Sequence, residues 1–376
     1  MNVQECYICG GNKFKECLHQ KPSMASDGRI VDFTIIKEEC QDCGTVRTND
    51  TTFLADFYKS DYELNTANID PVYIYNGNAY KKSTMHYEWI NKLLAKNNID
   101  LSTKNSIMEI GCGSGNLLSL FDVKAKFGVE PSEDAAHFAS KYANIRNTGF
   151  ENILDTEKYD IVLSTCVLEH TTNPNLFLQK NNNILNDEGI IILGIPIQNA
   201  ESFDVFFLDH LHHFTVNQLK HLCSENNLHI IDYEIGYMCI QTIAYFLIKK
   251  ISNDSNISSV PVYFEKNTNF ILSKKHLDSL NTFLETNNKK FIVAFGYGET
   301  SFFFQTYSDI NKFANFYIDD VKANNNNVLS IKNFALKNDL PNEITIILLV
   351  NPHYSEYIIK LFADIKCKIN FYNPLQ

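Results

Sequence analysis

Between Ser106 and about residue 245, short apolar runs alternate with segments of helical periodicity. Four of these runs have the length and apolar content of strands that are buried on both faces of a parallel sheet. They are SIMEIG, AKFGVE, YDIVLST and GIIILGIP, at residues 106–111, 125–130, 159–165 and 189–196. Just before them, residues 84–97 place Trp89, Ile90, Leu93 and Leu94 on one side at helical spacing. The alternation predicts a doubly wound α/β domain.

The same rhythm restarts nearer the C-terminus. Residues 250–290 are polar and helical only in part, and three further strand-like runs follow: KKFIVAFGYGE, FANFYIDD and EITIILLV. Polar connections separate them, including an asparagine run at 324–327 that we interpret as a solvated loop. Two α/β units that each open with a glycine-rich turn suggest two Rossmann-like domains in tandem. We expect an N-terminal cysteine-rich module with its connector at 1–75, a first α/β domain at 76–248 and a second at 249–376.

Charge and composition narrow the function classes. The 376 residues carry 33 Lys and Arg against 44 Asp and Glu, which gives a net charge of −11. This balance lacks the basic surface that phosphate backbones demand, so we expect no nucleic acid partner. No apolar stretch approaches the roughly 18 residues that span a bilayer, and the N-terminus does not resemble a secretory signal. We expect a cytoplasmic protein with no membrane partner, whose ten cysteines are thiols or metal ligands.

Two C-x-x-C pairs stand in the N-terminal region, each followed directly by a glycine. Four thiolates match the tetrahedral ligand set of Zn²⁺, and the trailing glycine permits the tight turn that each knuckle requires. The ligands would be Cys6, Cys9, Cys40 and Cys43. The 30 intervening residues predict a small β-hairpin or loop domain, and four reduced, unliganded cysteines are the alternative. A closed set of four leaves no open coordination position, so we expect this zinc to be structural.

A glycine-rich turn follows the first predicted strand. The segment IMEIGCGSGN places Gly111, Gly113 and Gly115 between that strand and a helical run, with Glu109 inside the strand. The next strand ends at Glu130, at about the separation at which an acid reaches a ribose diol. Such glycines approach a pyrophosphate in dinucleotide enzymes and the amino-acid part of S-adenosylmethionine, with an acid near its ammonium, in methyltransferases. The acid in the strand and the G-C-G-S-G form favour the methyltransferase, and glycines that only close a turn are the remaining alternative.

The third strand leads into the segment EKYDIVLSTCVLEHTTNP, which puts Glu169 and His170 at the edge where open α/β sheets bind ligands. With this "LEH", the glycine motif and the acidic end of the second strand, the sequence resembles class I S-adenosylmethionine-dependent methyltransferases. The resemblance implies that the cofactor is lined by Gly111, Gly113, Gly115, Glu130 and the backbone of Cys166, Val167 and Leu168. Phe150 is a candidate to pack on the adenine, although a core role is equally compatible with the sequence.

The order of parts along nearly the whole chain resembles a narrower family, the sugar methyltransferases typified by bacterial deoxysugar C-methyltransferases. CYICG…CQDCG…DFYKSDYELN looks like their zinc module and aromatic connector, and FIVAFGYGETSFF…FYIDD…ITIILLVNPHYSEYI like their C-terminal domain. The resemblance implies an α/β fold with three parts: an N-terminal zinc-binding module, a class I methyltransferase Rossmann-like core and a second, C-terminal Rossmann-like domain without its own cofactor. It also implies a nucleotide-linked sugar, or a similar nucleotide-activated precursor of a surface polysaccharide or natural product, as substrate.

The glycine-rich loop of the C-terminal domain has an alternative interpretation. Gly296 and Gly298, followed by Asp319 and Asp320 after the next strand, would otherwise indicate a nicotinamide cofactor. We favour a domain that completes the substrate cleft or contacts the nucleotide part of the substrate.

The segment FFLDHLHHFT gathers an aspartate and three histidines. In the sugar C-methyltransferases the corresponding segment carries a Glu-His pair and then Tyr-Phe, with further tyrosines upstream and near the connector. By this resemblance Asp209 and His210 take the Glu-His places, His213 stands where the tyrosine would be, and Tyr75 and Tyr80 are the connector candidates. We expect His210, oriented by Asp209, to act as the base.

Two departures from that family favour oxygen over carbon as the methyl acceptor. Aspartate replaces glutamate, and the upstream tyrosine falls among Phe206, Phe207 and Leu208, which offer no hydroxyl. Methylating carbon in a 4-keto sugar requires a stabilised enolate, whereas an alcohol requires little more than one base. We therefore expect O-methylation, with C-methylation of a nucleotide-linked 4-keto-deoxysugar as the alternative.

A metal held jointly by His210 and His213 is a weaker interpretation, because their flanks look like a loop that enters a helix. Thr215 and Gln218 would form a capping box at the start of that helix. Other classes stay open: an RNA or protein methyltransferase with a zinc module for target recognition, which the acidic balance disfavours, and a binding protein without activity. We expect a monomer or a homodimer.

Overall fold

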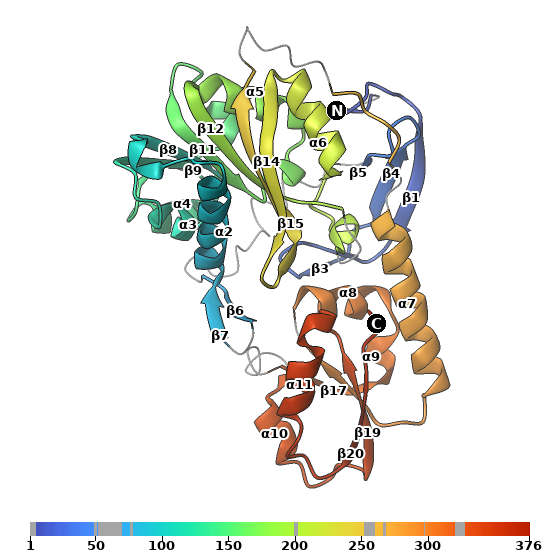
Figure 1. Ribbon diagram of the computed structural model, residues 1–376. Helices are drawn as coiled ribbons and strands as arrows, with labels where there is room; N and C mark the ends of the chain where they lie inside the picture. Colours follow the sequence, from blue (N-terminus) through green and yellow to red (C-terminus); the bar gives the residue numbers. More distant parts are fainter. Residues whose placement is uncertain are drawn as a thin grey trace. The chain divides into compact units, whose positions relative to one another are not determined.

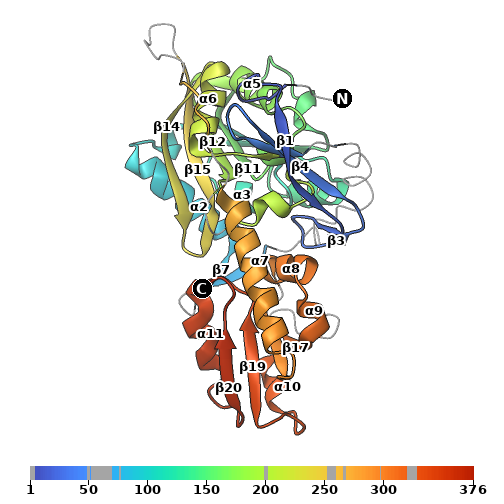
Figure 2. The same ribbon diagram turned by 90° about the vertical axis from the view of Figure 1, so that its right-hand side faces the viewer.

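The computed structural model describes residues 5–48, 51, 70–75, 78–198, 202–251, 260–265, 268–296, 298–319 and 328–376. The chain forms two units, drawn in Figures 1 and 2. Unit 1 consists of Met1–His19, Ile36–Asn199 and Asp209–Asn267, and unit 2 of Gln20–Ile35, Ala200–Leu208 and Thr268–Gln376. Most of the predicted connector and Asp320 lie outside the described residues. The division of the chain into three functional parts stays a prediction.

Unit 1 is built on a seven-stranded sheet in the order β10-β9-β8-β11-β12-β15-β14. Its strands are β8 (Ser106–Ile110), β9 (Ala125–Val129), β10 (Asn144–Arg146), β11 (Tyr159–Thr165), β12 (Leu185–Pro196), β14 (Leu228–Tyr237) and β15 (Ile240–Lys250). The first five are parallel, and the β14–β15 hairpin joins β12 in antiparallel pairing. The four strands that the sequence predicts are confirmed as β8, β9, β11 and β12. The strand order reverses between β8 and β11, so their carboxyl ends flank the crevice in which open α/β sheets bind ligands.

Helices cover both faces of this sheet, which explains why its strands read as continuous apolar runs. The helices are α2 (Lys82–Lys96), α3 (Asn116–Ser119), α4 (Glu133–Ala139), α5 (Pro174–Ile184) and α6 (Val216–Glu225), with 3-10 turns η2 (Leu101–Thr103), η3 (Phe150–Asn152) and η4 (Leu168–His170). Along β12, Ile190 packs in a cluster with residues of α2, α3 and α4, whereas Ile191 packs with residues of α5 and α6. The predicted apolar side of α2 is buried.

The cysteine-rich segment forms a second, four-stranded sheet in the order β1-β4-β5-β13. Its strands are β1 (Phe14–Gln20), β4 (Ile35–Cys40), β5 (Val46–Thr48) and β13 (His212–His213). β13 pairs antiparallel with β5, so that His212 lies opposite Arg47 and His213 opposite Val46. The sequence predicts a loop here, and the structure instead makes this dipeptide a strand of the cysteine-rich sheet. The capping box of Thr215 and Gln218 is confirmed at the start of α6.

Short hairpins complete the N-terminal half. The hairpin of β6 (Val72–Tyr75) and β7 (Asn78–Lys81) leads into α2. The hairpin of β2 (Ser23–Met24) and β3 (Ile30–Val31) belongs to unit 2, so the residues between the two cysteine pairs are shared by both units.

Unit 2 contains a five-stranded sheet that is parallel throughout, in the order β18-β17-β16-β19-β20. Its strands are β16 (Ile292–Phe295), β17 (Ala314–Ile318), β18 (Val328–Leu329), β19 (Glu343–Leu348) and β20 (Lys368–Tyr372). Its helices and turns are η5 (Asp204–Phe206), α7 (Thr268–Thr286), α8 (Glu299–Tyr307), α9 (Ile310–Phe313), α10 (Ile331–Ala335), η6 (Pro352–Tyr354) and α11 (Ser355–Leu361). The three predicted strands are confirmed as β16, β17 and β19.

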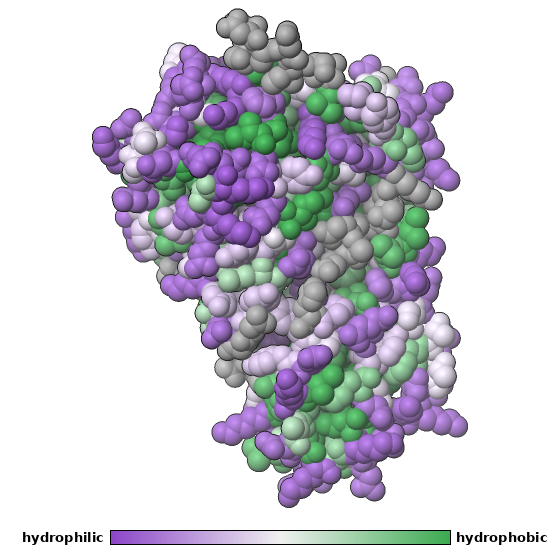
Figure 3. All heavy atoms as spheres, viewed as in Figure 1, coloured by the Kyte–Doolittle hydropathy of each residue, from purple (hydrophilic) through white to green (hydrophobic). Residues whose placement is uncertain are grey.

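Apolar side chains are concentrated inside the units, and polar residues cover much of the face drawn in Figure 3. Among the described residues, no helix combines the length and the apolar content needed to cross a bilayer.

Candidate cofactor and acceptor site

A cavity of about 910 Å³ opens at the carboxyl edge of the large sheet in unit 1. Its walls come from the start of α2, the turn after β8, the end of β9, the segment 148–151 and the segment after β11. The volume lies within the range of pockets that hold small molecules and cofactors. The cavity therefore coincides with the crevice that the strand order predicts.

The glycine turn forms one wall. Gly111 has a φ of +69°, and a Cβ on this residue would lie 2.5 Å from Cγ2 of Val167, so the β8 and β11 turns approach as closely as glycine allows. Gly113 has a φ of +52° and lines the cavity, and a Cβ there would meet no atom within 4 Å. The main chain of the glycine turn thus faces the cavity, at the position where the sequence predicts a close approach to a ligand.

Two buried carboxyls stand beside this turn. Glu130 accepts hydrogen bonds from the main-chain N–H groups of Gly113 and Ser132, both at 2.9 Å. Burial raises the pKa of Glu130, although these two hydrogen bonds oppose the rise. Burial, together with the charge of Glu130, raises the pKa of Glu109 well above its ordinary value. A cation entering the cavity would compensate the charge of Glu109.

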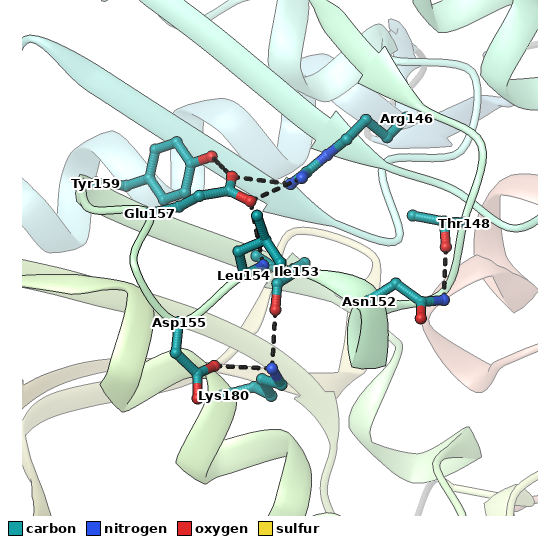
Figure 4. Close-up of polar contacts among 9 residues, drawn as sticks. All are labelled: Arg146, Thr148, Asn152, Ile153, Leu154, Asp155, Glu157, Tyr159 and Lys180. Carbon is teal, nitrogen blue, oxygen red and sulfur yellow. Dashed lines mark hydrogen bonds and ion pairs between the residues drawn. The ribbon is translucent and has the colours of Figure 1, made fainter.

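A polar network fixes the wall at 148–151 (Figure 4). The guanidinium of Arg146 donates to both carboxylate oxygens of Glu157, at 2.8 and 3.0 Å, and the hydroxyl of Tyr159 also donates to Glu157. Burial would raise the pKa of Glu157, but these hydrogen bonds outweigh it and lower the pKa. Asn152 donates to the hydroxyl of Thr148 at 2.8 Å, across the turn that carries Phe150. The wall is therefore braced from within unit 1.

The structure brings most of the predicted cofactor residues together. Those that line the cavity are Glu109, Gly111, Gly113, Glu130, Cys166 and Val167, together with Phe150. Phe150 also contacts the core, since its ring lies 5.1 Å from that of Phe177. Gly115 precedes α3 and lies against Ala139, and Leu168 is buried, so neither is part of the cavity wall.

The predicted catalytic residues lie differently from the expectation. Tyr75 and Tyr80 sit on the β6–β7 hairpin, and His213 is buried in β13; none of these lines the cavity. Asp209 and His210 are also buried away from its surface. His170, which lies beside Asp209 and His210, does line the cavity. The sequence places it after the third predicted strand, but we did not predict it as a site residue.

A carboxylate–imidazole cluster, defined here as Glu169, His170 and His210, connects the histidine segment to the cavity. One ligand atom from each of these side chains lies within 4.8 Å of the others. The rings of His170 and His210 are 4.6 Å apart and nearly perpendicular. The carboxylate of Asp209, expected to orient His210, lies 3.6 Å from Nδ1 of His170. The joint His210–His213 metal site that the sequence allowed is therefore replaced by a grouping of His210 with Glu169 and His170.

Further residues of the cavity were not predicted from the sequence. Asp70 accepts a hydrogen bond from the main-chain N–H of Ser83 at 3.0 Å, and both line the cavity beside α2. His86, also in the wall, lies with Nδ1 2.9 Å from the hydroxyl of Tyr245, and burial lowers its pKa to about 3. In the sequence, His86 is distinguished only as a polar residue next to the apolar side of the predicted helix.

The four predicted zinc ligands converge at the edge of the four-stranded sheet. Their Sγ atoms all lie within 4.8 Å of one another, with Cys6 and Cys43 3.7 Å apart and Cys9 and Cys40 3.6 Å apart. A tetrahedral site with Zn–S bonds of about 2.3 Å has sulfur–sulfur edges of about 3.8 Å. The N–H of the glycine after each pair donates back to the first cysteine's carbonyl, at 2.9 and 2.8 Å. The residues therefore fit a Cys₄ zinc site.

Comparisons with known proteins address the large sheet and its cavity. The family described as "Methyltransferase domain" matches residues 80–233. That range contains the glycine turn, both buried carboxyls and the carboxylate–imidazole cluster. Residues 80–233 form a class I S-adenosylmethionine-dependent methyltransferase domain.

Relatives match the methyltransferase domain over part of their length. The ubiquinone biosynthesis O-methyltransferase of Rhodopseudomonas palustris (strain TIE-1) is 31% identical over 109 residues, which cover 26% of this chain and 42% of the relative. The enzyme of the same name from Glaesserella parasuis serovar 5 is 30% identical over 112 residues, 26% of this chain and 48% of the relative. The chain thus spans less than half the length of these curated relatives.

Among solved structures, an S-adenosylmethionine-dependent methyltransferase from Clostridium acetobutylicum is similar at 12% identity and a TM-score of 0.38, covering 53% of this chain and 97% of that one.

Proposed function

We propose that the protein transfers the methyl group of S-adenosylmethionine to an oxygen atom of a small molecule. The observation that carries this proposal is the place of His170, whose side chain lines the cavity of the methyltransferase domain and belongs to the carboxylate–imidazole cluster. Methyl transfer to a hydroxyl requires a group that handles the hydroxyl proton beside the sulfonium methyl, and a positioned group of this kind contributes about 10²–10⁴ in rate.

S-adenosylmethionine, when bound, supplies an electrophilic methyl on a sulfonium. Glu109 would face its ammonium, and the cation would offset the buried negative charge. Glu130 would hold the ribose hydroxyls, and Phe150 would pack on the adenine. Gly111 and Gly113 would let the main chain approach the amino-acid part of the cofactor.

The acceptor that we propose is a nucleotide-linked sugar or a related nucleotide-activated precursor. Support comes from the order of three parts along the chain: the cysteine pairs, the methyltransferase motifs and the C-terminal strands. This order resembles that of the three-part sugar methyltransferases. Unit 2 would correspond to their second Rossmann-like domain. Oxygen is favoured over carbon because the curated relatives are named O-methyltransferases and because Phe206, Phe207 and Leu208 provide no hydroxyl for an enolate.

The zinc module is part of the same proposal. Cys6, Cys9, Cys40 and Cys43 would hold one structural Zn²⁺ as thiolates. Because β13 completes the sheet of this module, the zinc would also hold the polypeptide that carries His210.

Mass spectrometry of the full chain, incubated with S-adenosylmethionine and a panel of nucleotide-linked sugars, tests the proposal. The panel contains pairs that differ only in a 4-keto or a 4-hydroxyl group. A gain of one methyl on the hydroxyl member supports O-methylation. A gain only on keto sugars, with solvent deuterium at the neighbouring carbon, shows C-methylation instead, and methylation of RNA or protein but of no sugar would replace the substrate class.

A further inference from the structure

Three polar side chains form a series of hydrogen bonds beside the cavity. The hydroxyl oxygen of Tyr245 lies 2.9 Å from Oγ1 of Thr165 and, on its other side, 2.9 Å from Nδ1 of His86. Tyr245 is fully buried, whereas Thr165 and His86 line the cavity. We call Thr165, Tyr245 and His86 the hydroxyl–imidazole triad. It connects β11, β15 and α2 within unit 1.

The direction of these hydrogen bonds decides what the triad presents to the cavity. Burial lowers the pKa of His86 to about 3, so the ring is neutral and carries one N–H and one lone pair. Two directions satisfy both hydrogen bonds. In the first, Thr165 donates to Tyr245, Tyr245 donates to Nδ1, and Nε2 carries the hydrogen of the ring. In the second, Nδ1 donates to Tyr245 and Tyr245 donates to Thr165, so the hydrogen of Thr165 is left for another acceptor.

The buried end of the triad favours the second direction. Nε2 of His86 is buried and has no hydrogen-bond partner among the residues that the structure describes. Unpaired N–H groups are rarer in protein interiors than under-satisfied acceptors, so the ring hydrogen lies on Nδ1. The Thr165 hydroxyl then accepts from Tyr245 and is itself a donor at the cavity wall. The triad thus presents a neutral hydrogen-bond donor to a ligand.

This donor lies on the same side of the large sheet as Glu109. Leu163 stands opposite Glu109 in the parallel pairing of β11 with β8. Side chains two residues apart on a strand share a face, so Thr165 lies on that face too. Burial raises the pKa of Tyr245 well above its ordinary value, and the charge of Glu109 adds to the rise, so the triad lies close to this carboxyl.

The carboxylate of S-adenosylmethionine is bonded to the same carbon as the ammonium, so it needs donors close to Glu109. The N–H groups of residues 111–113 in the glycine turn already donate to oxygen atoms at the end of β9. At the start of α2, both the N–H and the hydroxyl of Ser83 donate to Asp70. Within the described part of the chain, the hydrogen of Thr165 has no such acceptor.

We propose that Thr165, oriented by Tyr245 and His86, donates a hydrogen bond to the carboxylate of S-adenosylmethionine. This assignment rests on the proposed function, which places the ammonium of the cofactor beside Glu109. Thr165 touches the cofactor, and Tyr245 and His86 act through it as positioning residues. Because the donor is neutral, the carboxylate keeps its attraction for the ammonium. The hydrogen bond fixes the amino-acid arm of the cofactor and with it the direction of the sulfonium methyl.

Titration calorimetry of the full chain with two cofactors tests this hydrogen bond without any methyl acceptor. Decarboxylated S-adenosylmethionine retains the sulfonium, the amine, the ribose and the adenine and lacks only the carboxylate. Thr165→Val keeps the shape of the side chain. It should raise the Kd for S-adenosylmethionine about 10- to 100-fold, because a hydrogen bond to a charged group is lost. The Kd for the decarboxylated cofactor should change by less than about threefold.

Further variants separate this contact from a general effect on the cavity wall. Thr165→Ser restores the hydroxyl and should recover most of the affinity for S-adenosylmethionine. Tyr245→Phe should also weaken S-adenosylmethionine selectively, but less than Thr165→Val, because the Thr165 hydroxyl remains. Thr103→Val replaces an exposed threonine of η2 outside the cavity and should bind both cofactors as the native protein does. Thermal unfolding checks that each variant is folded, and Thr165→Ala replaces Thr165→Val if the valine variant does not fold.

Equal weakening of both cofactors in Thr165→Val would overturn the proposal, because the hydroxyl would then serve the cavity wall and not the carboxylate. A selective loss in Lys82→Met, with none in Thr165→Val, would also overturn it. The carboxylate would then belong to Lys82, which lines the cavity as well.

These failures differ from failure of the proposed function. Either of them leaves cofactor binding by the native protein, and so the methyltransferase proposal, intact. A selective loss in Thr165→Val together with no methyl transfer to any sugar of the panel supports the hydrogen bond and refutes the acceptor class. Native protein that binds neither cofactor refutes both proposals.

Discussion

The ammonium group of Lys37 donates a hydrogen bond to the main-chain carbonyl oxygen of His210, 173 residues away in the sequence. Lys37 lies on β4 in the cysteine-rich sheet and is fully buried. It also donates to the hydroxyl of Thr48 at 2.9 Å, and that hydroxyl donates to the same carbonyl of His210 at 3.2 Å. The N-terminal sheet thus holds the main chain beside the methyltransferase cavity by buried polar contacts.

Replacing Lys37 by Met should lower both stability and activity, without changing cofactor affinity. Methionine is apolar and of similar length, but it leaves two buried acceptors, the carbonyl of His210 and the hydroxyl of Thr48, without their charged donor. A lost partner of this kind costs about 1–3 kcal/mol, so the unfolding temperature should fall. The segment that carries His210 would lose its charged anchor, and displacement of about 1 Å near a reacting group costs on the order of 100-fold in kcat. The Kd for S-adenosylmethionine should not change, because Lys37 does not line the cavity.

Thermal unfolding, kcat and cofactor affinity measured on one preparation check this prediction. Lys13→Met, a lysine outside the buried contacts of β4, is the matched control and should leave all three unchanged. A native kcat in Lys37→Met, measured at a temperature at which the variant is folded, would mean that the contact serves folding alone.

Removal of the zinc that we propose for the Cys₄ set should disorder the sheet that includes β13. In zinc-finger peptides the metal contributes an apparent binding free energy of about 10–16 kcal/mol, which is folding free energy for so small a module. Cys40→Ser should therefore abolish protection of the Thr48 amide, which donates to the carbonyl of Leu211 at 2.8 Å. Hydrogen exchange resolved by mass spectrometry measures this loss, and Cys17→Ser, which lies outside the quartet, should retain zinc and protection.

The parts of the fold that depend on local pattern were predictable from the sequence. β8, β9, β11 and β12 each contain a short, mostly apolar run that is largely buried, and the glycine turn follows β8 directly. Glu130 could be placed at the turn because adjacent parallel strands end at the same sheet edge. The cysteine quartet followed from its spacing.

The acceptor side could not be predicted in the same way, because it is assembled by contacts between distant segments. His210 meets Glu169 and His170 only because the residues after it pair with β5, and two-residue strands carry no periodic signal. Lys37 is polar within an alternating strand, where a pattern predicts exposure, yet it is buried by its hydrogen bonds to the histidine segment. Side-chain chemistry alone therefore pointed to the histidine segment but not to His170, the residue in the cavity wall.

Alanine at Gly111 and at Gly113 should have different effects. Both residues have positive φ, which costs a non-glycine residue roughly 1–2 kcal/mol. At 111 the new Cβ would also lie 2.5 Å from Cγ2 of Val167, whereas at 113 no atom lies within 4 Å. Gly111→Ala should therefore lower the free energy of unfolding more, and Gly113→Ala should mainly weaken cofactor binding, by about tenfold or more.

Urea unfolding and calorimetric titration with S-adenosylmethionine check this pair. Adding Val167→Ala should restore part of the stability lost in Gly111→Ala and none of that lost in Gly113→Ala. Equal stability losses in the two single variants would contradict the close approach of the β8 and β11 turns.

Breaking the Arg146–Glu157 pair should loosen the cavity wall at 148–151. It should also remove a part of the free energy of unfolding that depends on pH in the acid range. The pKa of Glu157 is lower in the folded protein than in the unfolded chain. The ion pair therefore contributes to the free energy of unfolding above the unfolded pKa of Glu157, and this contribution is lost as pH falls through the folded pKa. The stability gap between native protein and Arg146→Met should therefore narrow from about pH 6 toward about pH 3. Unfolding temperatures across this range measure the gap, and a pH-independent gap would assign the loss to packing of the arginine stem.

Cofactor binding should be linked to the protonation of Glu109. Because burial and Glu130 raise the pKa of Glu109 well above its ordinary value, the free protein holds this carboxyl protonated at pH values where an exposed glutamate is ionised. The contribution of Glu109 to the free energy of unfolding is therefore full below the pKa that this carboxyl has in the unfolded chain. It is lost as pH rises through the higher pKa of the folded protein. An ammonium placed beside the group favours the carboxylate, so binding of S-adenosylmethionine should release a proton below the raised pKa. The Kd should then fall by up to about tenfold per pH unit as pH rises, and level off once Glu109 is ionised in the free protein.

Titration calorimetry in two buffers of different ionisation enthalpy, between about pH 5 and pH 9, counts that proton directly. Glu109→Gln keeps the shape of the side chain but has no proton to release, so its Kd should be higher and lose this slope. If Glu109→Gln shows the same slope as the native protein, the proton comes from another group, and Glu130, which lies at the same turn, is the next residue to replace.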